Sequence, residues 1–399
     1  MKPVVVDFSS LLPSGMRERR DRSSSKTFRE LACMKSVQDL IKSISTSLKD
    51  GSLRGFAKRR AEADFLLAAA LRLEKQFGGN VEKIGGVDLN VRVLKYTASK
   101  KSCGVGRVYA SAIQKNKKNG KLVKDLQIGL VEPRRGDTSH PPNLSLQGMP
   151  GALRKAACGG FARDFDFVNC HFQLCVQLAN VFKGIKSCSM SNVSIYINNR
   201  TQVIQDVSEF YGLKSDASTF EGFRKELVKK LFLQIMFGGS VSSWASLHAS
   251  KGVSMHSPFV LSVQRELKDL RSAVEKSPEF SPLWKALFAS KREERKAATA
   301  YKQSVHAISC SVFSLILQTI EHDHMSLLAS VFETSGVEVI SLQYDGILVE
   351  AGGILNFEPI VQRAIAEIFE QTGFKVEIIE KPMMGLNNVA PMLLRSGDM

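Results

Sequence analysis

The chain has 399 residues, with 55 Lys and Arg against 39 Asp and Glu, which gives a formal net charge of +16 at pH 7. This length allows two or three subdomains, and the charge suits a polyanionic partner, although many basic proteins have none. The seven cysteines lack CxxC spacing, which argues against a disulfide framework or a zinc site. No apolar run reaches the length of a membrane span and no signal-peptide core begins the chain, so we expect an intracellular protein with no membrane partner.

The first hundred residues predict a helical region behind a basic, exposed start. RERRDRSSSK, residues 17–26, is rich in Arg and Ser and is expected to be flexible. Apolar residues at helical spacing between 37 and 48 predict one helix, and ADFLLAAALRLEKQFGG, residues 63–79, predicts a second. These helices either clamp a duplex or cap the core.

Positive charge is concentrated in residues 91–160, where fourteen Lys and Arg stand against three acids, so that 14 − 3 gives +11. QKNKKNGK, residues 114–121, predicts a hairpin tip that carries several of these lysines. A run of charge is usually a solvated face. Here the basic segment directly precedes an acidic strand, which favours contact with a phosphate backbone close to a metal site.

The stretch FARDFDFVNCHFQLCVQLAN, residues 161–180, predicts a short strand that passes into a helix between 169 and 171. Asp164 and Asp166 alternate with apolar residues on this strand. Ionised carboxylates in such a setting need a metal ion or a cationic partner, unless the strand is simply a solvated edge.

Two further segments complete the predicted core. HAISCSVFSLILQTIEHDHMSLLASVF, residues 306–332, predicts a long buried helix, and its EHDHM part is expected to be a solvated helix face instead of a metal site. VEVISLQYDGILVEA, residues 337–351, predicts a hairpin whose turn presents Asp345, with Gly346 supplying backbone freedom. Carboxylates on neighbouring strands are the usual holders of Mg²⁺, so Asp166 and Asp345 are the candidate metal ligands. A helix ending at Gly373 and a closing strand from 375 follow.

Four short motifs resemble those of family A DNA polymerases in order and spacing. They are CGVGRVYAS at 103–111, PNLSLQGMPGALRKA at 142–156, DFVNCHFQLCVQLAN at 166–180 and RKELVKKLFLQIMFGGS at 224–240, followed by the Tyr-Asp-Gly turn at 344–346. The resemblance covers residues 101–399. The first hundred residues are too few for a proofreading exonuclease domain and show no acidic motif for one.

The resemblance implies an α+β protein of polymerase right-hand architecture, with an antiparallel palm sheet and helical fingers. Residues 1–100 would be a short thumb-like helical region, 101–180 the first part of the palm, 181–304 the fingers and 305–399 the second part of the palm. The implied function is extension of a primer by dNTPs on a template, without 3′–5′ exonuclease. The alternatives are an RNA polymerase, a reverse-transcriptase-like or primase-like enzyme on this fold, and a non-catalytic nucleic-acid-binding protein with a degenerate palm.

The resemblance also implies roles for individual residues. Asp166 and Asp345 would hold two Mg²⁺ ions, or Mn²⁺, with Asp164 as a less favoured third carboxylate. The residues implied to bind the nucleotide are Lys229, Lys225, His171, Leu233 and Phe237. The residues implied to bind the primer-template are Arg107, Arg154, Gln147 and Gly238. Accessory replication proteins are further expected partners.

Simpler structural interpretations stay open for some of these residues. Lys225 and Lys229, one helical turn apart, could belong to an ordinary amphipathic helix, and Gln147 could be a loop amide on the surface. His171 could exclude ribonucleotides or be a satisfied core histidine. The sequence departs from the family at several positions, among them His171 for Glu, Tyr344 for His and Gly346 for Glu.

Overall fold

A computed structural model of the chain describes residues 11–13, 16, 25–49, 57–77, 81–84, 87–98, 108–112, 126–127, 145–149, 151–213, 220–250, 255–297, 305–354 and 356–383. The described residues form twelve helices and nine strands, and the strands pair in two antiparallel sheets. The expected α+β class with an antiparallel sheet is therefore confirmed. Arg107 and the lysine-rich tip at 114–121 lie outside the described residues.

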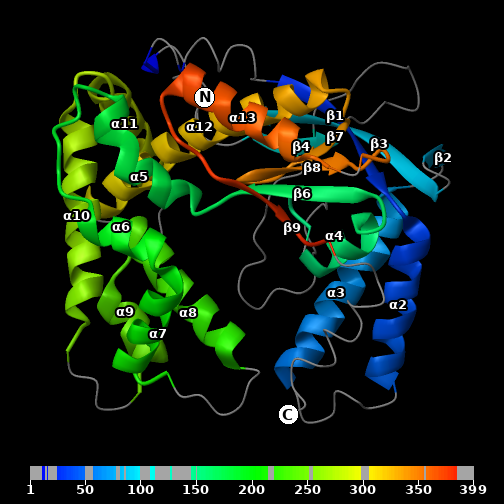
Figure 1. Cartoon of the computed structure of the whole chain (residues 1–399). Coiled ribbons are helices and arrows are strands. Elements are labelled where there is room, and N and C mark those ends of the chain that lie inside the picture. Colours follow the sequence, from blue (N-terminus) through cyan, green and yellow to red (C-terminus); the bar gives the residue numbers. More distant parts are fainter. Residues whose placement is uncertain are drawn as a thin grey trace.

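The second sheet lies at the centre of the molecule, between a helical lobe and the N-terminal region (Figure 1). Its strand order is β7-β8-β6-β9, so the segment from the middle of the chain pairs with two segments near its end. The strands are β6 (Ala162–Phe167), β7 (Val339–Leu342), β8 (Gly346–Glu350) and β9 (Ile378–Lys381). This arrangement confirms the predicted strand before residue 169, the hairpin around Asp345 and the closing strand.

The two faces of this sheet have different partners because successive side chains on β6 point in opposite directions. Phe165 packs against Phe332 and Phe357, with ring centroids 5.0 and 5.4 Å apart. Phe332 belongs to α12 (Val305–Thr334), and Phe357 caps the start of α13 (Glu358–Thr372). The opposite face carries Asp164 and Asp166 and joins a second core with α4 (Gly151–Cys158).

Helices α5–α11 form the lobe on one side of the central sheet (Figure 1). Their large aromatic residues fill its core: Tyr196 stacks on Phe232 at 4.0 Å, and Trp244 and Trp284 are buried. The helices are α5 (Cys170–Val181), α6 (Ser191–Asn198), α7 (Arg200–Phe210), α8 (Phe220–Met236), α9 (Val241–His248), α10 (Pro258–Lys276) and α11 (Ser281–Ala297).

The N-terminal region contains the two expected helices, α2 (Met34–Lys49) and α3 (Ala57–Gln76), and also a sheet that the helical prediction missed. The strands are β1 (Ser25–Ala32), β2 (Val81–Ile84), β3 (Val87–Ala98), β4 (Val108–Ala112) and β5 (Leu126–Gln127). On β3, the buried residues Leu89 and Val91 alternate with Asn90 and Arg92, which are only partly buried, and this is the pattern of a strand. The region is therefore mixed, not purely helical.

The EHDHM segment of α12 is buried, so the prediction of a solvated helix face was wrong. Glu321, His322, Asp323 and His324 are each no more than 1% exposed. His324 packs edge-on against Phe167 and Phe374, at 6.2 and 5.2 Å between ring centroids. Because α12 is covered by the sheet and by neighbouring helices, the polar residues of this segment are buried as well. In the described part of the chain, no helix has the length and apolar character needed to cross a membrane.

Candidate functional site

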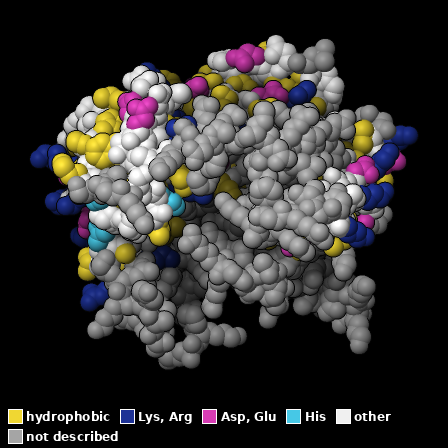
Figure 2. Space-filling view, turned by 90° about the horizontal axis from the view of Figure 1, so that it is seen from below, with side chains coloured by type: hydrophobic (Ala, Val, Ile, Leu, Met, Phe, Trp, Pro, Cys, Tyr) yellow, Lys and Arg dark blue, Asp and Glu magenta, His cyan; other side chains and the backbone are white. Residues whose placement is uncertain are grey.

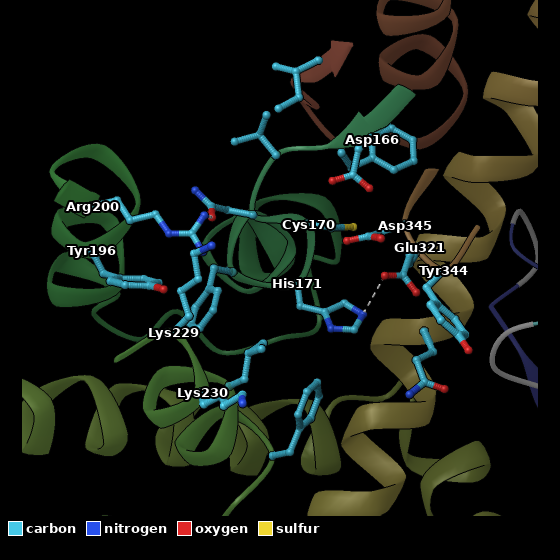
Figure 3. Close-up of a pocket in the computed structure, with 18 of the residues that line it drawn as sticks. Asp166, Cys170, His171, Tyr196, Arg200, Lys229, Lys230, Glu321, Tyr344 and Asp345 are labelled. Carbon is cyan, nitrogen blue, oxygen red and sulfur yellow. Dashed lines mark hydrogen bonds and ion pairs between the residues drawn. The ribbon is translucent and has the colours of Figure 1, made fainter. Parts of the chain in front are cut away.

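A cleft of about 640 Å³ lies between the edge of the central sheet and the helical lobe (Figure 3). One wall comes from β6, the β7–β8 turn and the end of β9. The other wall comes from the first turn of α5 and from α6, α7 and α8, and α12 closes the back. A volume of this size is typical of small-molecule sites in proteins.

The sheet wall presents Asp166 and Asp345 to the same space (Figure 3). The turn is fixed against β6, because the backbone N–H of Phe167 donates to the carbonyl of Asp345 at 2.8 Å. Gly346 lies so close to β6 that a Cβ atom there would stand 2.1 Å from the carbonyl oxygen of Phe165. Gly346 has no positive φ, so the turn needs glycine for close approach and not, as we expected, for backbone freedom.

Electrostatics at this wall oppose ionisation of Asp166. Burial, and then the charge of Asp345, raise the pKa of Asp166 to about 7, while Lys381 on β9 opposes this rise. Lys381 Nζ contacts Asp166 Oδ2. Burial also raises the pKa of Asp164, against the lowering influence of Arg154. A cation placed between Asp166 and Asp345 would remove their repulsion.

The helical wall presents Arg200, Lys229 and Lys230 to the cleft. Lys229 Nζ forms an ion pair with Glu226 at 2.7 Å and is about a quarter exposed. Arg200 Nη1 donates to Asn169 Oδ1, and its guanidinium lies 5.7 Å from the ring of Tyr196. Asn169 has a φ of 49°, a left-handed conformation that Asn tolerates better than most residues, and it begins α5 directly after the acidic strand.

His171 points across the cleft toward α12 (Figure 3). Its Nε2 lies 3.2 Å from Glu321 Oε1, and its ring meets Phe237 edge-on at 5.6 Å between centroids. The side chain is buried and also lines the cleft. His171 is therefore held by protein partners and stays within reach of a ligand.

The structure brings together seven of the predicted site residues and separates the others. Those that line the cleft are Asp166, Asp345, His171, Lys229, Leu233 and Phe237, and Asp164 lies beside them on the same face of β6. Lys225 lines a separate hollow of about 210 Å³ between α7 and α8. Gly238 lies behind the cleft against Cys310, with a φ of 80°. Gln147 is buried, and Arg154 hydrogen-bonds protein atoms.

Sequence reasoning missed Arg200, Lys230, Glu321 and Lys381. Lys230 adjoins a residue that was proposed, and Glu321 belongs to the EHDHM segment that was set aside as a solvated face. Arg200 and Lys381 stand in segments with no distinctive spacing, and only the folding of α7 and β9 against the cleft reveals them.

The donor set fits a hard divalent cation that shares its shell with a ligand. Among the described residues there is no group of three or more His, Cys, Asp and Glu able to enclose a metal ion. Two carboxylates suffice for Mg²⁺, because this ion keeps several waters and commonly completes its shell with substrate phosphates. Seen from below, described Lys and Arg side chains lie on both sides of the molecule (Figure 2).

Comparison with known proteins gives one distant similarity of note. No family model matches the chain. The chain is 23% identical over 239 residues to a protein of the Sputnik virophage named "Putative helicase V13". The aligned part covers 60% of this chain and 27% of that protein, so the chain spans about a quarter of the length of the relative it matches.

This comparison contradicts the resemblance to family A DNA polymerases. The similarity is to a protein named as a helicase, so the polymerase family, the DNA polymerase function and the alternatives derived from that resemblance are corrected. The right-hand architecture and the primer-template and dNTP partners rested on the same motifs. Those motifs are short, and they depart from the family at positions with distinct chemistry, such as Gly346 and Tyr344.

Proposed function

We propose that this chain acts on nucleic acid and binds a nucleoside triphosphate, as a complex with a divalent cation, in the cleft between the central sheet and α8. The observation that carries the proposal is the separation of charge across the cleft. The carboxylates of Asp166 and Asp345 stand on one wall, where Lys381 contacts Asp166, and Arg200, Lys229 and Lys230 stand on the other, where Glu226 pairs with Lys229.

This separation suits a ligand that carries both charges. A nucleotide complexed with a metal presents the cation on one side and phosphate oxygens on the other. Asp166 and Asp345 would hold Mg²⁺ or Mn²⁺, and the three basic side chains would donate to the phosphates. When bound, the metal would neutralise phosphate charge.

The remaining residues of the cleft would orient the nucleotide. Leu233 is 44% exposed and Phe237 is partly buried, so both offer apolar surface to a sugar or base. Glu321 Oε1 lies 3.2 Å from His171 Nε2, so the imidazole would meet the ligand beside a carboxylate.

Two observations support an action on nucleic acid. The net charge of +16 suits a polyanionic partner, and the similarity is to a protein that is named a helicase. The sequence contains no GxxxxGK[ST] motif, the usual phosphate-binding loop of nucleotide-driven motors.

The two lysines of α8 provide a matched test. Lys229→Gln should weaken binding of Mg²⁺·ATP or Mg²⁺·dATP about tenfold or more, because a charged hydrogen bond to phosphate contributes about 1.5–3 kcal/mol. Lys225→Gln removes the same charge one turn away, in the separate hollow, and should change affinity less than about twofold. Calorimetric titration measures both variants. Equal losses would mean that only the overall charge matters, and the cleft would be rejected as the nucleotide site.

A second candidate function is hydrolysis of the bound triphosphate, which the name of the similar protein favours. Release of inorganic phosphate, measured with and without single-stranded DNA, tests it. Hydrolysis at this site should depend on Mg²⁺, should rise with DNA and should be lost in Asp345→Asn. Hydrolysis that persists in Asp345→Asn would place the reaction outside the cleft.

A further inference from the structure

Arg154 was expected to grip nucleic acid, but its side chain is engaged by the protein. Its Nη1 donates to Gln343 Oε1 at 2.7 Å and lies 3.4 Å from the carbonyl oxygen of Leu146. Gln343 is 5% exposed and directly precedes the turn that carries Asp345.

Gln343 closes that turn through its backbone and its side chain. Its N–H donates to the carbonyl of Gly346 at 2.7 Å, and its Nε2 donates to Ser341 Oγ at 3.1 Å. The only hydrogen bond to Oε1 that the described residues show is the one from Arg154. Removing Arg154 would thus leave a buried carbonyl oxygen without its donor, which folded proteins rarely tolerate.

Arg154 is itself anchored on the N-terminal side. The loop that accepts from it is fixed by Glu30, which is fully buried and accepts from the N–H of Leu146 at 3.0 Å. Arg92 on β3 holds Glu30 by two nitrogens, at 2.9 and 2.6 Å. A continuous set of hydrogen bonds therefore runs from the first sheet through this loop to Arg154 and the β7–β8 turn.

We infer that Arg154 is a positioning residue, which holds the β7–β8 turn so that Asp345 faces the same space as Asp166. Arg154 acts through Gln343 and does not contact the nucleotide or the nucleic acid. The inference rests on the proposed metal–nucleotide site and adds what fixes its geometry. Two carboxylates that are both mobile would hold a cation more weakly than two that are fixed.

The test combines Arg154→Met, Gln343→Leu and the double variant, each measured for Mn²⁺ affinity from the resonance signal of free Mn²⁺ and for affinity to a single-stranded DNA oligonucleotide. Each single change should weaken Mn²⁺ binding about fivefold to a hundredfold, the usual effect of leaving one buried polar group unpaired. The double variant should bind Mn²⁺ no more weakly than the more affected single variant, because both changes break the same hydrogen bond between Arg154 and Gln343. DNA affinity should stay within about twofold of that of the unchanged protein, because Arg154 does not contact the nucleic acid. Loss of a phosphate contact would lower DNA affinity further.

Arg163→Met is the matched control, because this arginine lies on β6 beside Asp164 but points outward and pairs with Glu380 at 3.3 Å. It should leave Mn²⁺ affinity unchanged. Thermal unfolding checks each variant. If Arg154→Met does not fold, Arg154→Lys, which keeps the charge but not the guanidinium, and Gln343→Leu carry the test with the same expected direction.

The outcomes separate the two proposals. An Arg154→Met protein with weaker DNA binding and unchanged Mn²⁺ binding would overturn the positioning role and restore the nucleic-acid contact. Additive losses in the double variant would also overturn it. If the unchanged protein binds no Mn²⁺ with or without ATP, the proposed function itself fails, and the positioning role fails with it.

Discussion

Replacing Gly346 by Ala tests whether the close approach of β8 to β6 shapes the site. The added Cβ would meet Phe165 O at 2.1 Å and Asp166 Cα at 3.0 Å, both backbone atoms, whereas ordinary contacts begin at 3.4 Å. No side chain can move aside to relieve this overlap, so the two strands must separate where Gly346 pairs with Asp166.

The expected cost has two parts. Overpacking of a tight contact costs about 1–3 kcal/mol, and loss of one or two ladder hydrogen bonds adds about 1 kcal/mol each. The free energy of unfolding should therefore fall by about 2–5 kcal/mol, and Mn²⁺ affinity should fall with it because Asp345 moves away from Asp166.

Gly160→Ala is the control, since a Cβ at Gly160 would meet nothing within 4 Å and Gly160 has no positive φ. Urea unfolding followed by circular dichroism measures both variants. A loss below about 1 kcal/mol for Gly346→Ala, no larger than that of a typical surface change, would refute the reasoning from close approach.

Four further predictions concern the buried charges, the proposed metal site and the core. Burial and Asp345 raise the pKa of Asp166 to about 7, so between about pH 4 and 7 the folded protein keeps a proton that the unfolded chain releases. The free energy of unfolding should therefore fall as pH rises from 4 to 7. Asp166→Asn should flatten that slope in urea titrations. Mn²⁺ affinity should increase over the same range as the carboxylate ionises, and affinity that is constant from pH 5 to 8 would count against Asp166 as a ligand. Glu30→Ala leaves Arg92 without its buried partner and should cost about 3–5 kcal/mol, whereas a change under 1 kcal/mol would show that the pair is not coupled to folding. Phe165→Ala removes a ring between Phe332 and Phe357 and should cost about 3–5 kcal/mol in the same assay, and a much smaller loss would mean that α12 and α13 pack without it.

The elements around the site follow from the sequence because their patterns are local. The alternation about Phe165 and Phe167 predicted β6, the two apolar runs flanking Asp345 predicted the hairpin, and Gly373 marked the end of α13 in its left-handed conformation. These patterns depend on residues close together in the chain. Local periodicity therefore located the acidic wall of the cleft.

Two basic residues of the cleft could not be found in this way. Arg200 and Lys381 enter the cleft only because α7 packs against α6 and α8 and β9 pairs with β6, and nothing in their own segments distinguishes them from surface residues. Local spacing can also mislead. Lys225 and Lys229 lie one helical turn apart and were predicted to share one site, but they line two separate hollows. The polar segment of α12 was misjudged because burial depends on the surrounding elements and not on the composition of the helix.

The most direct test of the central claim is a crystal structure of the protein with Mn²⁺ and a non-hydrolysable ATP analogue, in which anomalous scattering locates the metal. We expect an anomalous peak at the carboxylates of Asp166 and Asp345, with the phosphates of the analogue directed toward Lys229, Lys230 and Arg200. A metal and nucleotide bound elsewhere, with the cleft filled by water alone, would contradict it.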